Sequence, residues 1–256
     1  MTVDADWHLL IDELDRVQAR ERQIDFWLRD DDAVEPTAPL DRLLSLAASH
    51  AVPLTLAVPP APATEALARH LSGRADIGVA AHGWAHRNHA PREEKKQELG
   101  AHRPPAVILD ELRRGAERLR TLFPEHFVPM LVPPWNRIDA ALSPRLPEIG
   151  FSVLSVFGPE KPSPFPLVNT HVDVMDWRGT RGCRDHTLII ADIIERIRQV
   201  CGDVEGREDQ SGGTLGLLTH HLVHDAAVWD FLEKLFTATS GHPACCWRRT
   251  RDLTDR

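Results

Sequence analysis

Short apolar runs alternate with helical segments along almost the whole sequence, and this order constrains the possible folds more than any other feature. Strand-like runs are expected at residues 24–28, 52–58, 77–81, 127–132, 151–156, 167–174 and 215–219. Apolar residues recur with a helical period between them, at residues 40–48, 64–71, 106–122, 140–149, 186–200 and 226–236. This pattern predicts an α/β protein with about seven parallel strands, arranged as one barrel-like or open sheet.

The sequence has no break in composition that would divide it into two α/β domains. Of its 256 residues, 42% are hydrophobic, which is enough for one full core. We expect a helical extension at residues 1–23, an α/β domain at residues 24–240 and a tail at residues 241–256. A polar stretch at residues 92–105 is expected to leave the alternating pattern as an excursion.

The distribution of charge limits the kinds of partner. The formal net charge is −8 and the acidic residues are spread through the chain, which disfavours nucleic acid and anionic membranes and favours a neutral or cationic small substrate. No apolar run reaches the roughly twenty residues of a membrane span, and the first residues lack the pattern of a signal peptide. We therefore expect a cytoplasmic protein, whose oligomeric state the sequence does not predict.

Three consecutive carboxylates, Asp30, Asp31 and Asp32, close the first strand-like run. Side chains at the carboxyl ends of parallel strands meet at one edge of the sheet, where such folds place their functional groups. Three ionised carboxylates repel one another unless a cation or an arginine compensates them. Arg29 is a candidate, although in a regular strand its side chain points to the opposite face from Asp30.

Two histidines, His82 and His86, follow the third strand-like run in the segment HGWAH. Two neutral imidazoles and one carboxylate form a ligand set that suits a divalent ion with open positions for water and substrate. Zinc is the expected ion, with cobalt, manganese or nickel as alternatives. The competing interpretation is that these histidines and the aspartate run merely stabilise loops and cap helices.

Two of these segments resemble motifs of the polysaccharide deacetylase (NodB-homology) family. The segment LRDDDA is similar to the family's T-F-D-D-G motif, which supplies a catalytic base and then a metal ligand. The resemblance implies that Asp30 is the base and Asp31 the ligand, with Asp32 in place of the usual glycine. The segment HGWAH is similar to the family's H-[ST]-x-x-H motif, which implies that His82 and His86 bind the metal.

A third segment, VPPWN, resembles the family's R-x-P-[YFW]-G motif but departs from it in one respect. Val132 stands where the family has an arginine that pairs with the base. Arg29 or Arg137 could take over this charge. The resemblance implies that Trp135 forms an aromatic wall of the substrate site, and Asn136 beside it is expected to contact substrate.

Two later segments complete the resemblance. The family's D-x-x-D-W motif is intact as Asp173, Asp176 and Trp177; in the family this segment lines the site, and its aspartate orients the catalytic histidine. The strand-like segment LLTHH matches an L-x-H motif, which implies that His220 is the general acid, with His221 as its competitor. Core positions for the tryptophans and a buried structural role for His220 are the alternatives.

Together the five segments imply a NodB-like distorted (β/α) barrel and a metal-dependent N-deacetylase. Such an enzyme releases acetate and a free amine from an amino sugar within a small molecule or an oligosaccharide. The residues expected to bind substrate are Trp135, Asn136, Asp176, Trp177 and His221. A related amidohydrolase acting on a non-sugar C–N bond and a non-catalytic carbohydrate-binding protein are the alternative functions.

Overall fold

Strand β1 (Ile24–Asp31) runs through the centre of the sheet in the computed structural model, which describes residues 6–163, 165–202 and 213–254. Every residue of β1 after Asp25 is buried. Both sides of the strand are paired in parallel, with β2 on one side and β7 on the other. Strands buried on both faces are typical of parallel sheets that helices cover, as the near-continuous apolar run predicts.

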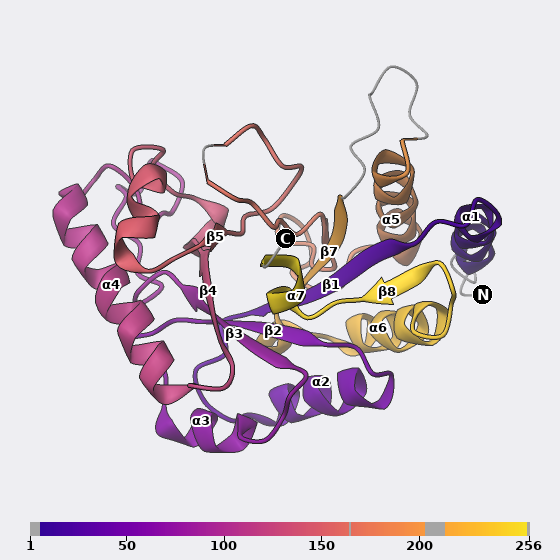
Figure 1. Ribbon diagram of the computed structural model, residues 1–256, viewed down its shortest axis with the longest axis horizontal. Helices are drawn as coiled ribbons and strands as arrows, with labels where there is room; N and C mark the ends of the chain where they lie inside the picture. Colours follow the sequence, from indigo (N-terminus) through magenta and orange to yellow (C-terminus); the bar gives the residue numbers. More distant parts are fainter. Residues whose placement is uncertain (1–5, 164, 203–212, 255–256) are drawn as a thin grey trace.

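Seven parallel strands follow one another across the sheet in the order β5-β4-β3-β2-β1-β7-β6 among the described residues (Figure 1). A further short strand, β8, pairs in parallel with the beginning of β1. The remaining strands are β2 (Leu54–Val58), β3 (Ile77–His82), β4 (Phe127–Val132), β5 (Val153–Leu154), β6 (Val172–Asp173), β7 (Thr214–Thr219) and β8 (Cys245–Trp247).

The sheet curls so that the segment leading into β6 returns beside β5. Isolated parallel bridges join Leu154 to Leu167 and Phe157 to Thr170. These bridges replace a regular strand pairing, so the barrel is closed irregularly along this side. The distorted (β/α) barrel that the sequence predicts is confirmed.

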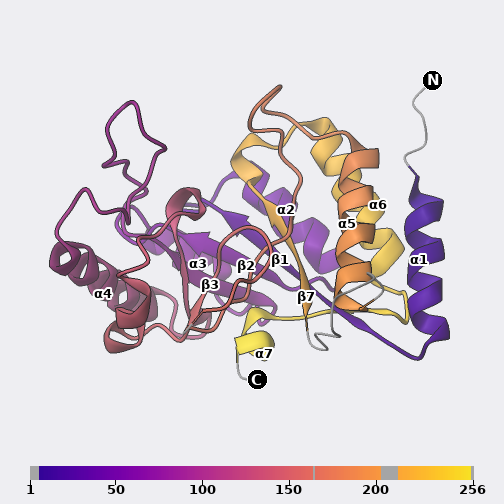
Figure 2. The same ribbon diagram turned by 90° about the horizontal axis from the view of Figure 1, so that it is seen from above.

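Helices cover the outside of the curled sheet (Figures 1 and 2). They are α1 (Trp7–Ala19), α2 (Ala38–Ser49), α3 (Glu65–Leu71), α4 (Pro105–Leu122), α5 (His186–Val200) and α6 (Ala226–Thr239). The short helix α7 (Thr250–Thr254) instead contributes Leu253 to a buried cluster with Trp27 of β1. Helix α1 packs against α5, and buried residues of α1 belong to the same hydrophobic cluster as the barrel. Within the described ranges, no helix is both long enough and apolar enough to cross a bilayer.

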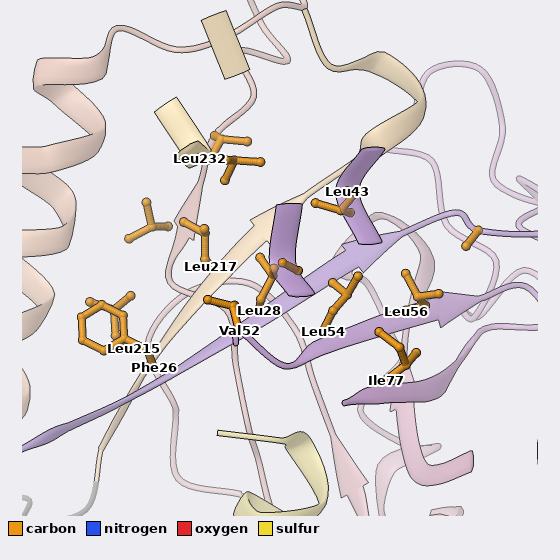
Figure 3. Close-up of a cluster of buried hydrophobic side chains, with 14 of the residues drawn as sticks. Phe26, Leu28, Leu43, Val52, Leu54, Leu56, Ile77, Leu215, Leu217 and Leu232 are labelled. Atoms are coloured by element: carbon orange, nitrogen blue, oxygen red, sulfur yellow. The ribbon is translucent and has the colours of Figure 1, made fainter. Parts of the chain in front are cut away.

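The two faces of β1 belong to two different parts of the core. Phe26 and Leu28 point outward and are fully buried beneath the helices; Figure 3 shows them with Leu217 of β7, Leu43 of α2 and Leu232 of α6. Burial of each such side chain contributes about 1.5–3 kcal/mol.

The alternate residues of β1 point into the barrel. Trp27 belongs to a second buried cluster, which includes Met130 and Val132 of β4. Because side chains alternate along a strand, Arg29 and Asp31 share this inner face with Trp27, whereas Asp30 shares the outer face with Leu28. This alternation decides which of the carboxylates can meet which partner.

Four predicted elements differ clearly from the structure. Strand β1 does not end at residue 28 but continues to Asp31, so Asp30 and Asp31 are strand residues. The helix predicted at residues 140–149 is a 3-10 helix, η2 (Ser143–Ile149), because Pro144 and Pro147 cannot donate helical hydrogen bonds. The strands predicted at 151–156 and 167–174 are regular only at Val153–Leu154 and Val172–Asp173.

The predicted division of the chain at residues 23 and 240 stays a prediction. Residues 1–5 of the expected extension and residues 255–256 of the expected tail lie outside the described residues. The described part of the tail contributes β8, whose Cys245 pairs with Ile24 of β1.

Gly216, in the middle of β7, is expected to be essential for packing inside the barrel. A Cβ atom there would lie 2.4 Å from both the Asn169 carbonyl oxygen and Trp27 Nε1. We expect Gly216→Ala to lower the free energy of unfolding by about 1–3 kcal/mol, because neither backbone nor a buried indole can move aside. Gly241→Ala is the matched control, since its Cβ would have no neighbour within 4 Å. Equal urea midpoints for the two variants would contradict this packing.

Candidate metal centre and active site

A carboxylate and two imidazoles meet at the carboxyl ends of β1 and β3. Asp32, His82 and His86 each offer one ligand atom, and these atoms all lie within 4.8 Å of one another. Oδ1 of Asp32 is 3.5 Å from Nε2 of each histidine. Among the described residues the set comprises three donors, one carboxylate and two imidazoles, which is the kind of set that binds a catalytic zinc or a related divalent ion.

The backbone and the burial of His82 prepare it as a ligand. It is the last residue of β3, and its Nδ1 lies 2.9 Å from the Val132 carbonyl oxygen of β4. A carbonyl accepts only from a protonated nitrogen, so Nδ1 carries the hydrogen and Nε2 keeps a lone pair facing Asp32. Burial also lowers the pKa of His82, which favours the neutral imidazole that binds metal.

Left-handed backbone conformations turn the other two candidate ligands toward His82. Asp32, the first residue after β1, has φ of 77°, and His86 has φ of 54°. Such values are uncommon for residues other than glycine and cluster at functional sites. At Asp32 the left-handed turn interrupts the alternation of the strand, so the direction of this side chain could not be inferred from the pleat.

Asp31 does not join the histidines but forms an ion pair with Arg29 inside the barrel. Nε of Arg29 lies 2.9 Å from Oδ1 of Asp31, and Nη2 donates to Oδ2 at 3.2 Å. The arginine is fully buried, and the Asp31 side chain is 3% exposed. Two residues apart on one strand, they share its inner face.

Arg29 also reaches across the barrel to other elements around the site. Its Nη1 donates to Oγ of Ser155 at 2.8 Å, and its Nη2 donates to Oδ1 of Asn136 at 3.1 Å. Of the two arginines considered for the charge absent at Val132, Arg29 is the one whose guanidinium lies beside Asp31. Arg137, the other candidate, donates instead to the exposed carbonyl of Lys96.

Asp30 lies on the outer face of β1 and binds the segment that follows β7. Its Oδ2 accepts hydrogen bonds from Thr219 Oγ1 at 2.7 Å and from the His221 backbone N–H at 2.8 Å. Its Oδ1 is in short contact with Nδ1 of His221. These partners flank His220 in the sequence, so Asp30 holds the chain on both sides of that residue.

The Asp30–His221 pair is charged and buried. Burial alone would raise the pKa of Asp30, but the charge and hydrogen bond of His221 lower it below its ordinary value. Burial alone would lower the pKa of His221, but Asp30 raises it. The two groups therefore stabilise each other's ionised forms beneath the site rather than facing a substrate.

His220 points into the barrel mouth, on the opposite side of the chain from His221. Its Nε2 lies 3.9 Å from Oδ2 of Asp31. Its ring packs edge-to-face with the Trp177 indole, with 4.7 Å between the ring centroids. Trp177 Nε1 donates in turn to Oδ2 of Asp173 at 2.9 Å. Burial raises the pKa of Asp173, and the charge of Asp31 adds to the effect, while His220 opposes it.

The expected substrate residues fall into two groups. Trp135 packs against His86 with ring centroids 4.4 Å apart, and Trp177 is 45% exposed, so neither has the fully buried position of a core aromatic. Asn136 lies at the site with Oδ1 engaged by Arg29. Asp176, in contrast, accepts hydrogen bonds from the backbone of residues 179 and 180 in its own loop, and His221 is turned to Asp30.

The structure places the three carboxylates differently from what the motif implied. The difference is one residue along the chain. Asp32, not Asp31, lies with the two histidines; Asp31, not Asp30, faces the site interior beside Arg29. The shift follows from β1, which extends to Asp31 and so places Asp30 on the outer face. A residue that no motif signalled, Glu98, also contacts this region through the backbone of residues 84, 85 and 87.

Comparison with known proteins identifies the fold. No model of a known protein family and no curated protein matches the sequence. Among solved structures, a putative polysaccharide deacetylase from Mycobacterium smegmatis is similar, with a TM-score of 0.62, 16% identity, and coverage of 91% of this chain and 90% of that one.

Two further solved structures are similar at the same level. A family 4 carbohydrate esterase from Streptomyces lividans, in complex with acetate, has a TM-score of 0.55 and 16% identity, covering 87% of this chain and 91% of that one. A family 4 acetyl xylan esterase from Clostridium thermocellum, in complex with a cobalt ion, has a TM-score of 0.56 and 13% identity, covering 90% of each chain. The chain therefore has the NodB-like fold of the polysaccharide deacetylases, as the motifs predict.

The Arg29–Asp31 pair gives a stability prediction. We expect Arg29→Met to lower the free energy of unfolding by about 3–5 kcal/mol, because it leaves the Asp31 charge buried without its partner. The double variant Arg29→Met/Asp31→Asn should recover part of this loss. Arg113→Met is the control, since its ion pairs on the surface of α4 contribute about 0–1 kcal/mol. The same loss in Arg29→Met and Arg113→Met, measured by urea unfolding, would contradict the assignment.

Proposed function

We propose that the chain is a metal-dependent N-deacetylase that hydrolyses an N-acetyl group of an amino-sugar-containing substrate. The observation that carries the proposal is the cluster of Asp32, His82 and His86 beside an arginine-paired Asp31 and a facing His220. A ligand set, an acceptor and a donor of protons are the groups that metal-assisted amide hydrolysis needs. The fold of the deacetylases adds support at the level of architecture.

Asp32, His82 and His86 would hold the divalent ion. The set combines two imidazoles with one carboxylate, which suits zinc best and also accepts cobalt, manganese or nickel. The chemistry that a bound ion supplies at such a site is Lewis-acid activation of water and of the amide carbonyl.

Asp31 is the proposed general base, in place of Asp30. It lies one residue before the proposed ligand Asp32, and one of its oxygens lies 3.9 Å from His220. Arg29 fixes the direction of the carboxylate and compensates its charge inside the barrel. Asp30 cannot take this role because it is fully buried on the outer face and bound to Thr219 and His221.

His220 is the proposed general acid that gives a proton to the departing amine. Its ring stands between Asp31 and Trp177, and Trp177 is itself tied to Asp173. The backbone N–H of His220 donates to Nε2 of His224 at 3.2 Å, and burial lowers the pKa of His224 to about 4, which keeps that acceptor neutral. His220 is thus positioned through its ring and through its backbone.

Trp135 and Trp177 are the proposed walls of the substrate site, on the metal side and on the acid side respectively. Asn136 contributes by fixing Arg29, and its amide group is the remaining polar candidate for substrate. Asp176 is bound within its own loop and His221 is bound to Asp30, so neither is proposed to contact the substrate. A small molecule or an oligosaccharide carrying the N-acetyl group, in a cytoplasmic setting, remains the expected substrate.

The non-catalytic alternative rested on Val132 in the arginine position and on Asp32 in the glycine position of the resembled motifs. Arg29 offsets the first departure, and Asp32 lies with the two histidines as a proposed ligand, so neither departure favours this alternative. An amidohydrolase acting on a non-sugar C–N bond would use the same groups. A panel of N-acetylated sugars and of linear and cyclic amides, assayed side by side, distinguishes the two reactions.

Substitutions of the neighbouring carboxylates Asp31 and Asp32 should have different effects on metal content and on turnover. We expect Asp32→Ala and His82→Ala to purify without metal and to be inactive. Asp31→Asn should keep its metal but lose about 10²–10⁴-fold in kcat, because it removes the proton acceptor and not a ligand. Elemental analysis and an acetate-release assay on N-acetylated sugars measure both quantities.

The exposed aspartate Asp41 on α2 provides a control, as Asp41→Asn should alter neither metal content nor kcat. If Asp31→Asn loses metal while Asp32→Ala retains it, the proposed division between ligand and base is wrong.

Substitution of the adjacent histidines His220 and His221 should affect kcat and stability differently. We expect His220→Ala to lower kcat by about 10²–10⁴-fold with little change in stability, since its side chain acts as the proton donor at the site. His221→Ala should be strongly destabilised instead, because it leaves Asp30 charged and buried without its partner. Thermal unfolding and kcat, measured on both variants, give the contrast; full activity in His220→Ala would contradict the assignment of the acid.

A further inference from the structure

The connection between β3 and α4 is a folded strap, residues 87–104, that packs beside the candidate metal centre. Asn88 Oδ1 accepts hydrogen bonds from the backbone N–H groups of Ala90 and Gln97, which closes the strap on itself. At its end, Arg103 pairs with Glu111 of α4 at 2.7 Å. The polar excursion expected from the sequence is therefore an ordered element fastened to its neighbours.

The strap buries one carboxylate, Glu98, which is 1% exposed. Its Oε2 accepts from the Trp84 backbone N–H at 3.0 Å. Its Oε1 accepts from the N–H groups of Ala85 at 2.9 Å and Arg87 at 3.1 Å. One carboxylate thus receives three backbone donors from the HGWAH segment and the residue after it, and the two donors to Oε1 lie on either side of His86.

Gly83 and Glu98 fit each other sterically. A Cβ atom on Gly83 would lie 2.0 Å from Oε2 of Glu98 and 2.7 Å from the ring of Pro134. Gly83 also has φ of 60°, a conformation that side chains rarely adopt. The glycine at the second position of HGWAH, where the resembled motif has serine or threonine, therefore leaves space for the carboxylate of the strap.

We propose that Glu98 is a positioning residue of the metal centre, holding the backbone on both sides of His86 so that this imidazole faces Asp32. The proposal rests on the metal site of the proposed function. The backbone of His86 is left-handed, and its side chain contacts the rings of His82 and Trp135 and lies 3.5 Å from the Asp32 carboxylate, so the direction of the imidazole depends on how the turn around it is held. Backbone N–H bonds to an ionised carboxylate are stronger than those between neutral groups, so one side chain can hold the turn.

The test compares Glu98→Gln and Glu98→Ala with wild type in zinc affinity, measured by competition with a chromophoric chelator. We expect about 10-fold weaker binding for Glu98→Gln, whose amide NH2 cannot accept, and close to 100-fold for Glu98→Ala. Glu94→Gln makes the same chemical change at an exposed site of the strap and should bind zinc as wild type does.

Hydrogen exchange without metal provides the second measurement. The N–H groups of residues 84, 85 and 87 should be protected in wild type and should exchange faster in Glu98→Gln, while β1 and β7 keep wild-type protection. This local change separates a loosened His86 segment from a chain that has failed to fold.

The outcomes distinguish this inference from the proposed function. If wild type binds zinc and Glu98→Gln binds it equally well, the positioning role is wrong and the metal site stands. If wild type itself does not bind zinc, the proposed metal site fails and this role fails with it. Fast exchange at residues 84, 85 and 87 in wild type would contradict the role whatever the affinity.

Discussion

The ion pair of Arg29 with Asp31 is the constraint on which the arrangement of the site depends. An arginine with no solvent exposure requires a partner inside the barrel, and the residue two positions along the same strand is the nearest that shares its face. Asp31 therefore lies inside the barrel and Asp30 lies on the outer face of β1. Asp32, at the turn, lies beside His82 of β3 and His86, which follows that strand. Ser155 and Asn136 then satisfy the rest of the guanidinium and fasten the far side of the barrel to β1.

Two other buried carboxylates accept hydrogen bonds from the residues around the proposed acid and one proposed ligand. Asp30 accepts from the residues before and after His220, and Glu98 accepts from the residues before and after His86. In each case the histidine side chain stays available while the flanking residues are tied down. Catalytic and metal sites need their functional groups held within a fraction of an ångström. Hydrogen bonds to the residues that flank a histidine hold its position and leave its side chain accessible.

Much of the architecture could be predicted from the sequence, because short apolar runs and helical periods survive in most elements. Strand β4 and helix α5 begin and end where the periodicity places them, and the histidines of HGWAH meet at the expected edge of the sheet. The positions of the three aspartate side chains could not be inferred from the motif. They depend on how far β1 continues and on the left-handed turn at Asp32, and neither leaves a periodic signal.

The alternation of side chains along a strand did predict part of this arrangement. Arg29 and Asp31 lie two residues apart and share a face, and Asp30 lies on the other face. Glu98 left no signal at all, because its partners are backbone N–H groups reached by the path of a polar loop. The contrast reflects a general difference: periodic patterns encode which face is buried, whereas contacts made by loops depend on the three-dimensional course of the chain.

Anomalous X-ray diffraction from crystals grown with cobalt is the most direct test of the proposed metal centre, because it locates the ion and its ligands in one measurement. We expect one strong peak bonded to Asp32, His82 and His86, with the Asp31 carboxylate still paired to Arg29 and outside the coordination sphere. A peak bonded to Asp31, or no peak between β1 and β3, would contradict it.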